Sequence, residues 1–190
     1  MKKFNWPLMN NNINHLDKKT LIKFINSTDK FTNGIKVKNF EKKWSKWLGV
    51  KYSTFVNSGA SANLISLNIL KEIKKNKSEV ILPAFTWSSD VVSVINSGFK
   101  PIFVDIKLKN LALDEELVKK KITKKTAAIF LTHAMGFLGI SKKFLNFINK
   151  KKIFLIEDTC ESHGVELDGK KAGTLGGISN FSFYYAHHMS

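Results

Sequence analysis

Arginine is absent from this chain of 190 residues, although lysine contributes 31 positive charges and the net charge is +16. Arginine is the residue best suited to reading base edges and to clamping phosphates through two hydrogen bonds. We therefore predict no nucleic-acid partner and interpret the lysines as a solvated surface that can attract an anionic substrate. The alternative, a basic nucleic-acid-binding protein without catalytic activity, predicts an affinity for DNA or RNA that falls steeply with salt.

Cysteine is nearly absent as well, with Cys160 alone in the sequence. One cysteine excludes a disulfide within the chain and fits a reducing compartment. The first 12 residues are polar and lack the apolar core of a secretory signal, and no apolar run approaches the roughly 20 residues that span a bilayer. We expect a soluble, cytoplasmic protein with no membrane partner.

Strands and helices alternate along the sequence, and several predicted strands are continuous apolar runs, as in IFLT and IFLIE. Strands buried on both faces have this pattern, so we predict an α/β fold with a mainly parallel sheet flanked by helices. The predicted helices are Leu16–Ile25, Phe40–Leu48, Ala60–Ile73, Ser88–Asn96, Asp114–Lys121 and Lys142–Asn149. The predicted strands are Tyr52–Val56, Glu79–Leu82, Pro101–Asp105, Ala127–Thr132, Ile153–Glu157 and Asn180–Tyr185, and Asp168-Gly169 predicts a hairpin turn.

A turn of small residues, Asn57 to Asn63, precedes the predicted helix Ala60–Ile73. Small residues let the backbone approach an anion, and a helix N-terminus offers free N–H groups and a favourable dipole. Ser61 adds a hydroxyl. The alternative interpretation is an ordinary helix cap without a ligand.

Two further segments follow predicted strands, where open α/β sheets bind their ligands. Trp87 could stack on a planar ring, or it could be a core tryptophan. Asp158 ends a buried strand, which is costly unless a cation partners it; the alternatives are a cap or a salt bridge. A protonated pyridine nitrogen is one such cation. We predict a structural role for Glu157, whereas Glu161 could lie along the edge of the ring.

Near the end of the sequence, His187 and His188 stand side by side in an apolar context. Neighbouring residues seldom converge on one metal ion without further ligands, so we predict no metal site. The other interpretation is a structural histidine in the core or on the surface.

Taken in order, these segments resemble the sugar aminotransferase family of DegT or StrS type. The resemblance rests on Thr32-Asn33-Gly34 with Phe40-Glu41, NSGASAN, EVILPAFTW, residues 98–105, IEDTCESHG, and residues 173–177 leading into FSFYY. It implies the large domain of a pyridoxal-phosphate (PLP)-dependent transferase of the aspartate aminotransferase type, fold type I. We expect a helical entry segment at residues 1–50 and an incomplete PLP-binding domain at 51–190, with the small C-terminal domain absent.

The resemblance also implies roles for individual residues. Gly59, Ala60 and Ser61 would hold the cofactor phosphate with help from Ser182. Trp87 would stack on the pyridine ring, Asp158 would pair with the ring nitrogen, and Glu161 would lie near the ring hydroxyl.

The main departure from the family pattern is His187, which stands five residues after Ser182, where the transaminases have their cofactor-binding lysine. Imidazole cannot bind the cofactor covalently, but it can act as a base. This change resembles the 3-dehydratase branch, in which pyridoxamine phosphate (PMP) is bound without a covalent link.

The resemblance therefore implies 3-dehydration of a nucleotide-activated 4-keto-6-deoxy sugar in deoxysugar biosynthesis for surface polysaccharide. His187 would be the catalytic base and cofactor contact, glutamate the amino donor, and the full-length enzyme a homodimer. The alternatives are a sugar aminotransferase acting on a keto sugar and a fragment of either enzyme; we expect the isolated chain to bind cofactor weakly and to be inactive. Cys160 lies where one member of the branch has a cluster ligand, but an iron–sulfur cluster needs four ligands, so we predict a buried structural cysteine.

Overall fold

The computed structural model describes residues 13–189 and divides the chain into two compact units. The larger is Val56–Phe183, and the smaller combines Met1–Phe55 with Tyr184–Ser190. The predicted domain boundary at residue 50 stays a prediction.

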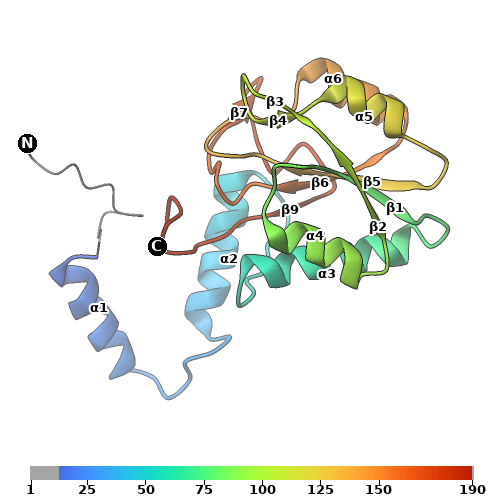
Figure 1. Cartoon of the computed structure of the whole chain (residues 1–190). Coiled ribbons are helices and arrows are strands. Elements are labelled where there is room, and N and C mark those ends of the chain that lie inside the picture. Colours follow the sequence, from blue (N-terminus) through green and yellow to red (C-terminus); the bar gives the residue numbers. More distant parts are fainter. Residues whose placement is uncertain (1–12, 190) are drawn as a thin grey trace, which may run out of the picture. The chain divides into compact units, whose positions relative to one another are not determined.

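A five-stranded parallel sheet forms the centre of the larger unit (Figure 1). Every neighbouring pair in the order β2-β1-β5-β6-β9 is parallel. The strands are β1 (Glu79–Pro83), β2 (Lys100–Val104), β5 (Thr126–Thr132), β6 (Phe154–Asp158) and β9 (Ile178–Asn180). The prediction of an α/β fold with a mainly parallel sheet is confirmed.

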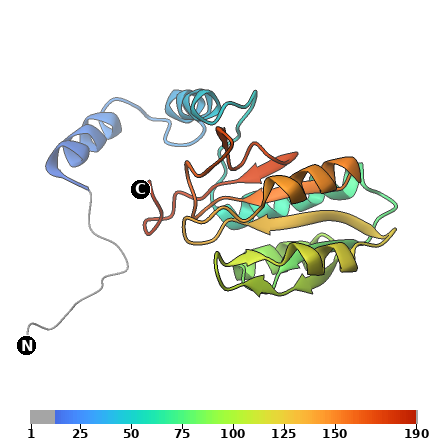
Figure 2. The same cartoon turned by 90° about the horizontal axis from the view of Figure 1, so that it is seen from above.

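Helices cover both faces of this sheet, because the alternating side chains of the central strands are apolar on both sides. The helices are α3 (Gly59–Ile73), α4 (Ser88–Asn96), α5 (Glu115–Lys121) and α6 (Lys142–Lys150). One buried core packs α3 and α4 against the strands, through residues such as Leu67, Val94 and Phe130. A second core packs α5 and α6 against the opposite face, through Val118 and Phe144. Figure 2 shows the strands running side by side in the same unit.

The order of the strands determines where a ligand can bind. From β1 the chain proceeds to β2 on one side and later to β5 on the other, so the connections diverge between β1 and β5. Open α/β sheets bind ligands at such a point, beyond the carboxyl ends of the strands. The segments that follow β1, β5, β6 and β9 all lie at this end, because the strands are parallel.

The turn at Asp168-Gly169 joins β7 (Glu166–Leu167) to β8 (Lys170–Lys171), which pair antiparallel, so the predicted hairpin is confirmed. Both turn residues have positive φ, 50° for Asp168 and 76° for Gly169, as a two-residue turn of this kind requires. A second small ladder pairs β3 (Ile106–Lys107) with β4 (Ala112–Leu113).

The smaller unit contains α1 (His15–Ile25) and α2 (Ile35–Leu48). Asn14 begins α1 with a capping box, and Gly49 ends α2 in the left-handed conformation. No residue of α1 is buried, whereas α2 buries Trp44 and Leu48. Among the described residues, no helix is long and apolar enough to cross a lipid bilayer.

Two predicted strands differ from the structure. Residues 52–56 form no strand; the N–H of Phe55 instead donates to the Glu41 carboxylate at 2.8 Å, so a side chain takes the place of a neighbouring strand. The strand predicted at Asn180–Tyr185 is wrong in position: β9 is Ile178–Asn180 and shares only Asn180 with the prediction. Asn180 is paired with Asp158, the last residue of β6. Because β6 ends there, the residues after Asn180 have no neighbouring strand to pair with.

Candidate functional site

The N-terminus of α3 can bind an anion. Ser58 caps the helix by accepting the N–H of Ser61 at 3.1 Å. Within the described part of the chain, the N–H groups of Gly59 and Ala60 have no hydrogen-bond acceptor. With 15 residues, α3 also has a substantial dipole whose positive end lies here.

Ser182 lies beside this helix start. A Cβ added to Gly59 would lie 3.3 Å from the Cβ of Ser182 and 3.7 Å from the Sγ of Cys160. Only glycine at this position leaves room for both neighbours without crowding. The structure thus brings Gly59, Ala60, Ser61 and Ser182 together, although 121 positions of sequence separate Ser61 from Ser182.

Asp158 ends β6 and is only 4% exposed. Its Oδ1 accepts the N–H of Cys160 at 2.9 Å. Among residues 56–183, no lysine forms an ion pair with this carboxylate, so the salt-bridge alternative is wrong for this unit. A buried anion that lacks a cation suits a cationic ligand group such as a protonated pyridine nitrogen.

Trp87 lies between β1 and α4, where it is the N-cap residue of the helix. Its side chain is 65% exposed, so the alternative of a core tryptophan is wrong. An exposed indole at the carboxyl end of the sheet has a free surface on which a planar ring can stack. Its contact with a cofactor stays a prediction.

Glu161 follows β6 by three residues and is half-buried. Its Oε2 accepts the N–H of Met135 at 2.9 Å, in the loop that follows β5. Met135 has φ 52°, a left-handed conformation that a methionine rarely adopts, and this hydrogen bond helps to hold it. Glu161 therefore links two loops of the candidate site, and its place near a cofactor hydroxyl stays a prediction.

His187 belongs to the smaller unit, so its predicted roles as base and cofactor contact are not tested by the larger unit. Its N–H donates to the carbonyl of Tyr184 at 2.8 Å, and its ring lies 5.7 Å from the Tyr184 ring at an angle of 70°. The backbone at His187 therefore forms a turn with Tyr184, and the two rings lie edge to face.

Cys160 is a free, half-buried cysteine. Burial raises the pKa of its thiol, and the negative charge of Asp158 raises that pKa further. The thiol is therefore protonated, as expected for a structural cysteine rather than for a metal-binding or nucleophilic one. Among the described residues, no group of three or more histidine, cysteine or acidic side chains could hold a metal ion.

A buried polar network beneath the site was missed in the sequence. Asn63 of α3 donates to the Oδ1 of Asp90 at 2.6 Å, and Asn180 donates to Asn63 at 2.8 Å. Both Thr86 and Thr132 place their hydroxyls on the Oδ2 of Asp90. A signal was present: Asn63 shares the spacing of the buried Leu67 and Leu70, so a polar residue occupies an apolar helix face.

On the other face of the sheet, Glu157 has the structural role that the sequence predicts. Its Oε2 lies 3.0 Å from the Nε2 of His133 and accepts the N–H of Gly173 at 2.8 Å. Its Oε1 accepts the N–H groups of Leu175 and Gly176. Since the Nδ1 of His133 accepts the N–H of Gly139, the ring carries its proton on Nε2 and donates it to Glu157.

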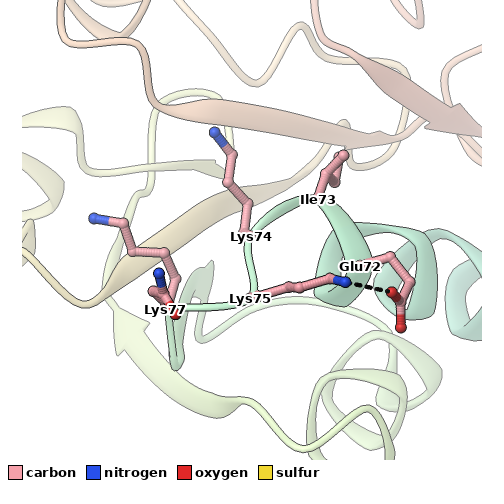
Figure 3. A pocket seen from close by; sticks show the side chains of 6 residues that line it. Glu72, Ile73, Lys74, Lys75 and Lys77 are labelled. Atoms are coloured by element: carbon pink, nitrogen blue, oxygen red, sulfur yellow. Dashed lines mark ion pairs between the residues drawn. The ribbon is translucent and has the colours of Figure 1, made fainter.

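A pocket of about 360 Å³ at the C-terminal end of α3 lies away from all these residues (Figure 3). The segment that lines it, residues 72–77, ends two residues before β1 begins. The pocket therefore lies at the amino end of the sheet. Lys75 points toward Glu72, with 3.6 Å between Nζ and Oε2, while Lys74 points away and Lys77 donates to the carbonyl of Lys124. Its polar groups do not converge, so we do not assign it a ligand.

Comparison with known proteins gives a match over most of the chain. The sequence profile of the DegT/DnrJ/EryC1/StrS aminotransferase family matches residues 12–190. The chain belongs to this family.

Three relatives within the family are informative. A GDP-4-keto-6-deoxy-D-mannose 3-dehydratase of Yersinia pseudotuberculosis is 36% identical over 98% of this chain and 48% of its own length. A crystal structure of a GDP-4-keto-6-deoxymannose 3-dehydratase with a trapped PLP–glutamate geminal diamine is 34% identical, with a TM-score of 0.90, over 98% of this chain and 49% of that one. A GDP-perosamine synthase of Vibrio cholerae is 33% identical over 80% of this chain and 41% of its own length. The chain thus spans about half the length of the first two relatives.

Proposed function

We propose that this chain forms the cofactor-binding part of a PLP/PMP-dependent enzyme that removes the 3-hydroxyl of a nucleotide-activated 4-keto-6-deoxy sugar. The observation that carries the proposal is His187 at the position where the family's transaminases have lysine. The similarity to two 3-dehydratases over 98% of the chain supports it. We place this reaction in deoxysugar biosynthesis for surface polysaccharide.

The residues of the larger unit fit this cofactor. The free N–H groups of Gly59 and Ala60, with Ser61 and Ser182, would hold the phosphate. Asp158 would keep the proton on the ring nitrogen, and Trp87 would cover one face of the ring. When bound, the cofactor supplies an amine for the C4 ketone of the sugar and a ring that takes up electrons.

His187 would move a proton at the C4′ carbon of the cofactor. An imidazole has an unperturbed pKa of about 6.5, so it can take and return a proton near neutral pH. Without a primary amine at this position, the nitrogen is not returned to the sugar by the lysine route, and the C3 hydroxyl becomes the leaving group.

Glutamate as the amino donor, a homodimer and a cytoplasmic location belong to the same proposal. The PLP–glutamate adduct in the solved relative supports the donor. The exposed apolar residues of α1, among them Leu16, Leu21 and Ile22, are compatible with contacts to a second subunit. The single cysteine fits a reducing compartment.

Transamination is the second candidate, favoured by the similarity to the GDP-perosamine synthase. The full-length protein that contains this chain should be incubated with PMP, glutamate and the GDP-, CDP- and dTDP-linked 4-keto-6-deoxyhexoses. We expect a product that has lost one oxygen atom, seen by mass spectrometry. A product with an amino group in place of the ketone oxygen would overturn the proposal in favour of transamination.

Borohydride reduction in the presence of PLP gives a second discrimination. A transaminase would yield a pyridoxyl-lysine in an active-site peptide, whereas the dehydratase would yield none there. His187→Lys is the positive control, because it restores a primary amine at the family position. Labelling of His187→Lys but not of the wild-type peptide is the expected result.

A further inference from the structure

Asp90 is a second buried carboxyl group next to Asp158, and no part of the proposed chemistry uses it. It lies in the first turn of α4 and is only 1% exposed. The hydroxyl of Thr132 contacts Asp90, and Thr132 is paired with Asp158 in the ladder of β5 and β6, so Asp90 lies next to Asp158. A hydrogen bond between two carboxyl groups requires that one of them is protonated.

Within residues 56–183, the surroundings of the pair contain no cation that would allow both acids to ionise. Asp90 faces Asn63 from α3, Thr86 from the loop before α4, and Thr132 from β5, all of them neutral. The titratable groups that act on it are Asp158 and, across the same site, the thiol of Cys160. Within residues 56–183, no lysine forms an ion pair with either acid.

The proton of the pair is assigned to Asp90. Burial, followed by the charge of Asp158, raises the pKa of Asp90 to about 8. The Oδ1 of Asp90 accepts from the Asn63 amide, which can only donate, whereas Oδ2 contacts two hydroxyls, which can donate or accept, so Oδ2 is the oxygen that can carry the proton. Asn63 is in turn fixed by Asn180, whose Oδ1 accepts the hydroxyl of Ser66 at 2.8 Å, so three elements hold the neutral acid in one orientation.

We propose that Asp90 is a positioning residue that, as a neutral acid, donates a hydrogen bond to the Asp158 carboxylate and holds it for the ring nitrogen of the cofactor. This role rests on the proposed function. This role explains why Asp90 can lie beside Asp158, the acid that would pair with the ring nitrogen. Because Asp90 is neutral, it orients Asp158 and leaves Asp158 as the single anion of the pair.

Three variants test this role. Asp90→Asn keeps the size, a donor for Asp158 and an acceptor for Asn63, but it cannot ionise. Asp90→Ala removes the hydrogen bond. Ser97→Ala is the matched control at the other end of α4, because the Ser97 hydroxyl is buried and makes no hydrogen bond within the described part of the chain.

The first measurement is the urea-induced unfolding of the 190-residue chain from pH 5 to pH 9, without cofactor. An acid whose pKa is raised from 3.8 to about 8 on folding is protonated in the folded state and ionised in the unfolded state between these values. Its contribution to stability is therefore complete below pH 4, is lost as the pH rises, and levels off above about pH 8. The unfolding constant of the wild type relative to Asp90→Asn should rise about tenfold per pH unit between pH 5 and 7. A constant ratio would overturn the protonation of Asp90.

The second measurement is the dissociation constant of PMP, which has no aldehyde to react with the many lysines. At pH 7 we expect Asp90→Asn and Ser97→Ala to bind PMP like the wild type, and Asp90→Ala to bind about tenfold more weakly. Above pH 8 the wild type should weaken while Asp90→Asn does not. If the wild type and both Asp90 variants bind PMP equally at every pH, the positioning role of Asp90 is overturned, but the proposed function is not. If the wild type does not bind PMP, the proposed function falls and this role with it.

Discussion

The two faces of the sheet at the end of β6 differ in the number of hydrogen-bond donors that they offer to a buried carboxyl group. Glu157 and Asp158 are neighbours in sequence, but because side chains alternate along a strand they point to opposite faces. Glu157 accepts hydrogen bonds from His133 and from three backbone N–H groups. Asp158 has one backbone donor and a second acid beside it.

This difference separates structure from function. The donors around Glu157 match the acceptor sites of one carboxylate, so its charge is compensated without a ligand. Asp158 instead keeps acceptor capacity that the larger unit does not satisfy, at the end of the sheet where α/β proteins bind ligands. We infer that removing Glu157 damages the fold, whereas changing Asp158 damages binding.

The largest expected effect is that of Glu157→Ala. It leaves the His133 donor and the N–H groups of Gly173, Leu175 and Gly176 without their acceptor, so the free energy of unfolding should fall by about 4 kcal/mol in urea titrations. Glu161→Ala is the control, because it removes a carboxylate with a single hydrogen bond, to Met135, and should cost about 1 kcal/mol. Equal losses for the two variants would contradict the contrast.

Asp158→Asn should separate binding from folding. The amide oxygen can still accept the N–H of Cys160 and the hydrogen bond of a neutral Asp90, so we expect the urea midpoint to change little. The charge for the ring nitrogen is lost, and PMP should bind about 100-fold more weakly at pH 7. If Asp158→Asn lost as much stability as Glu157→Ala and kept its PMP affinity, the assignment of a binding role to Asp158 would be wrong, and its role would be structural.

Gly59→Ala tests the phosphate end of the same site. The added Cβ would lie 3.3 Å from Ser182, closer than an ordinary contact, and should weaken PMP binding about tenfold without lowering stability. Ser58→Ala is the converse control: it removes the cap of α3 and should lower the unfolding free energy by about 1 kcal/mol. Unchanged PMP affinity in Gly59→Ala would argue against a phosphate at this turn.

The sequence was sufficient to predict the central strands of the sheet. Continuous apolar runs predicted β5 and β6 to within one residue at each end, and parallel strands bring the segments that follow them to one end of the sheet. The hairpin followed from Asp168-Gly169, since these residues readily adopt positive φ.

The sequence was not sufficient to predict the partners of the buried acids. In the sequence, Asp90 is indistinguishable from an ordinary acid in the first turn of a helix. Its hydrogen-bond partners Asn63 and Thr132 lie 27 and 42 residues away in the sequence. Which acid of the IED segment faces which helices depends on the register of β6 between β5 and β9. Such pairings between distant residues leave no local periodic signal.

The smallest expected effect on PMP affinity is that of substitutions in the lysine pocket at the amino end of the sheet, which lies far from both Glu157 and Asp158. Because α3 has 15 residues, the pocket lies about 22 Å along the helix from the predicted phosphate position. Charges are screened over about 8 Å at 0.15 M salt, so Lys74→Gln with Lys77→Gln should change PMP affinity less than about twofold there. At about 0.01 M salt the screening length grows to about 30 Å, and a larger weakening should appear. A tenfold loss at 0.15 M salt would mean that the anion binds at the lysines and that the acceptor capacity of Asp158 has another purpose.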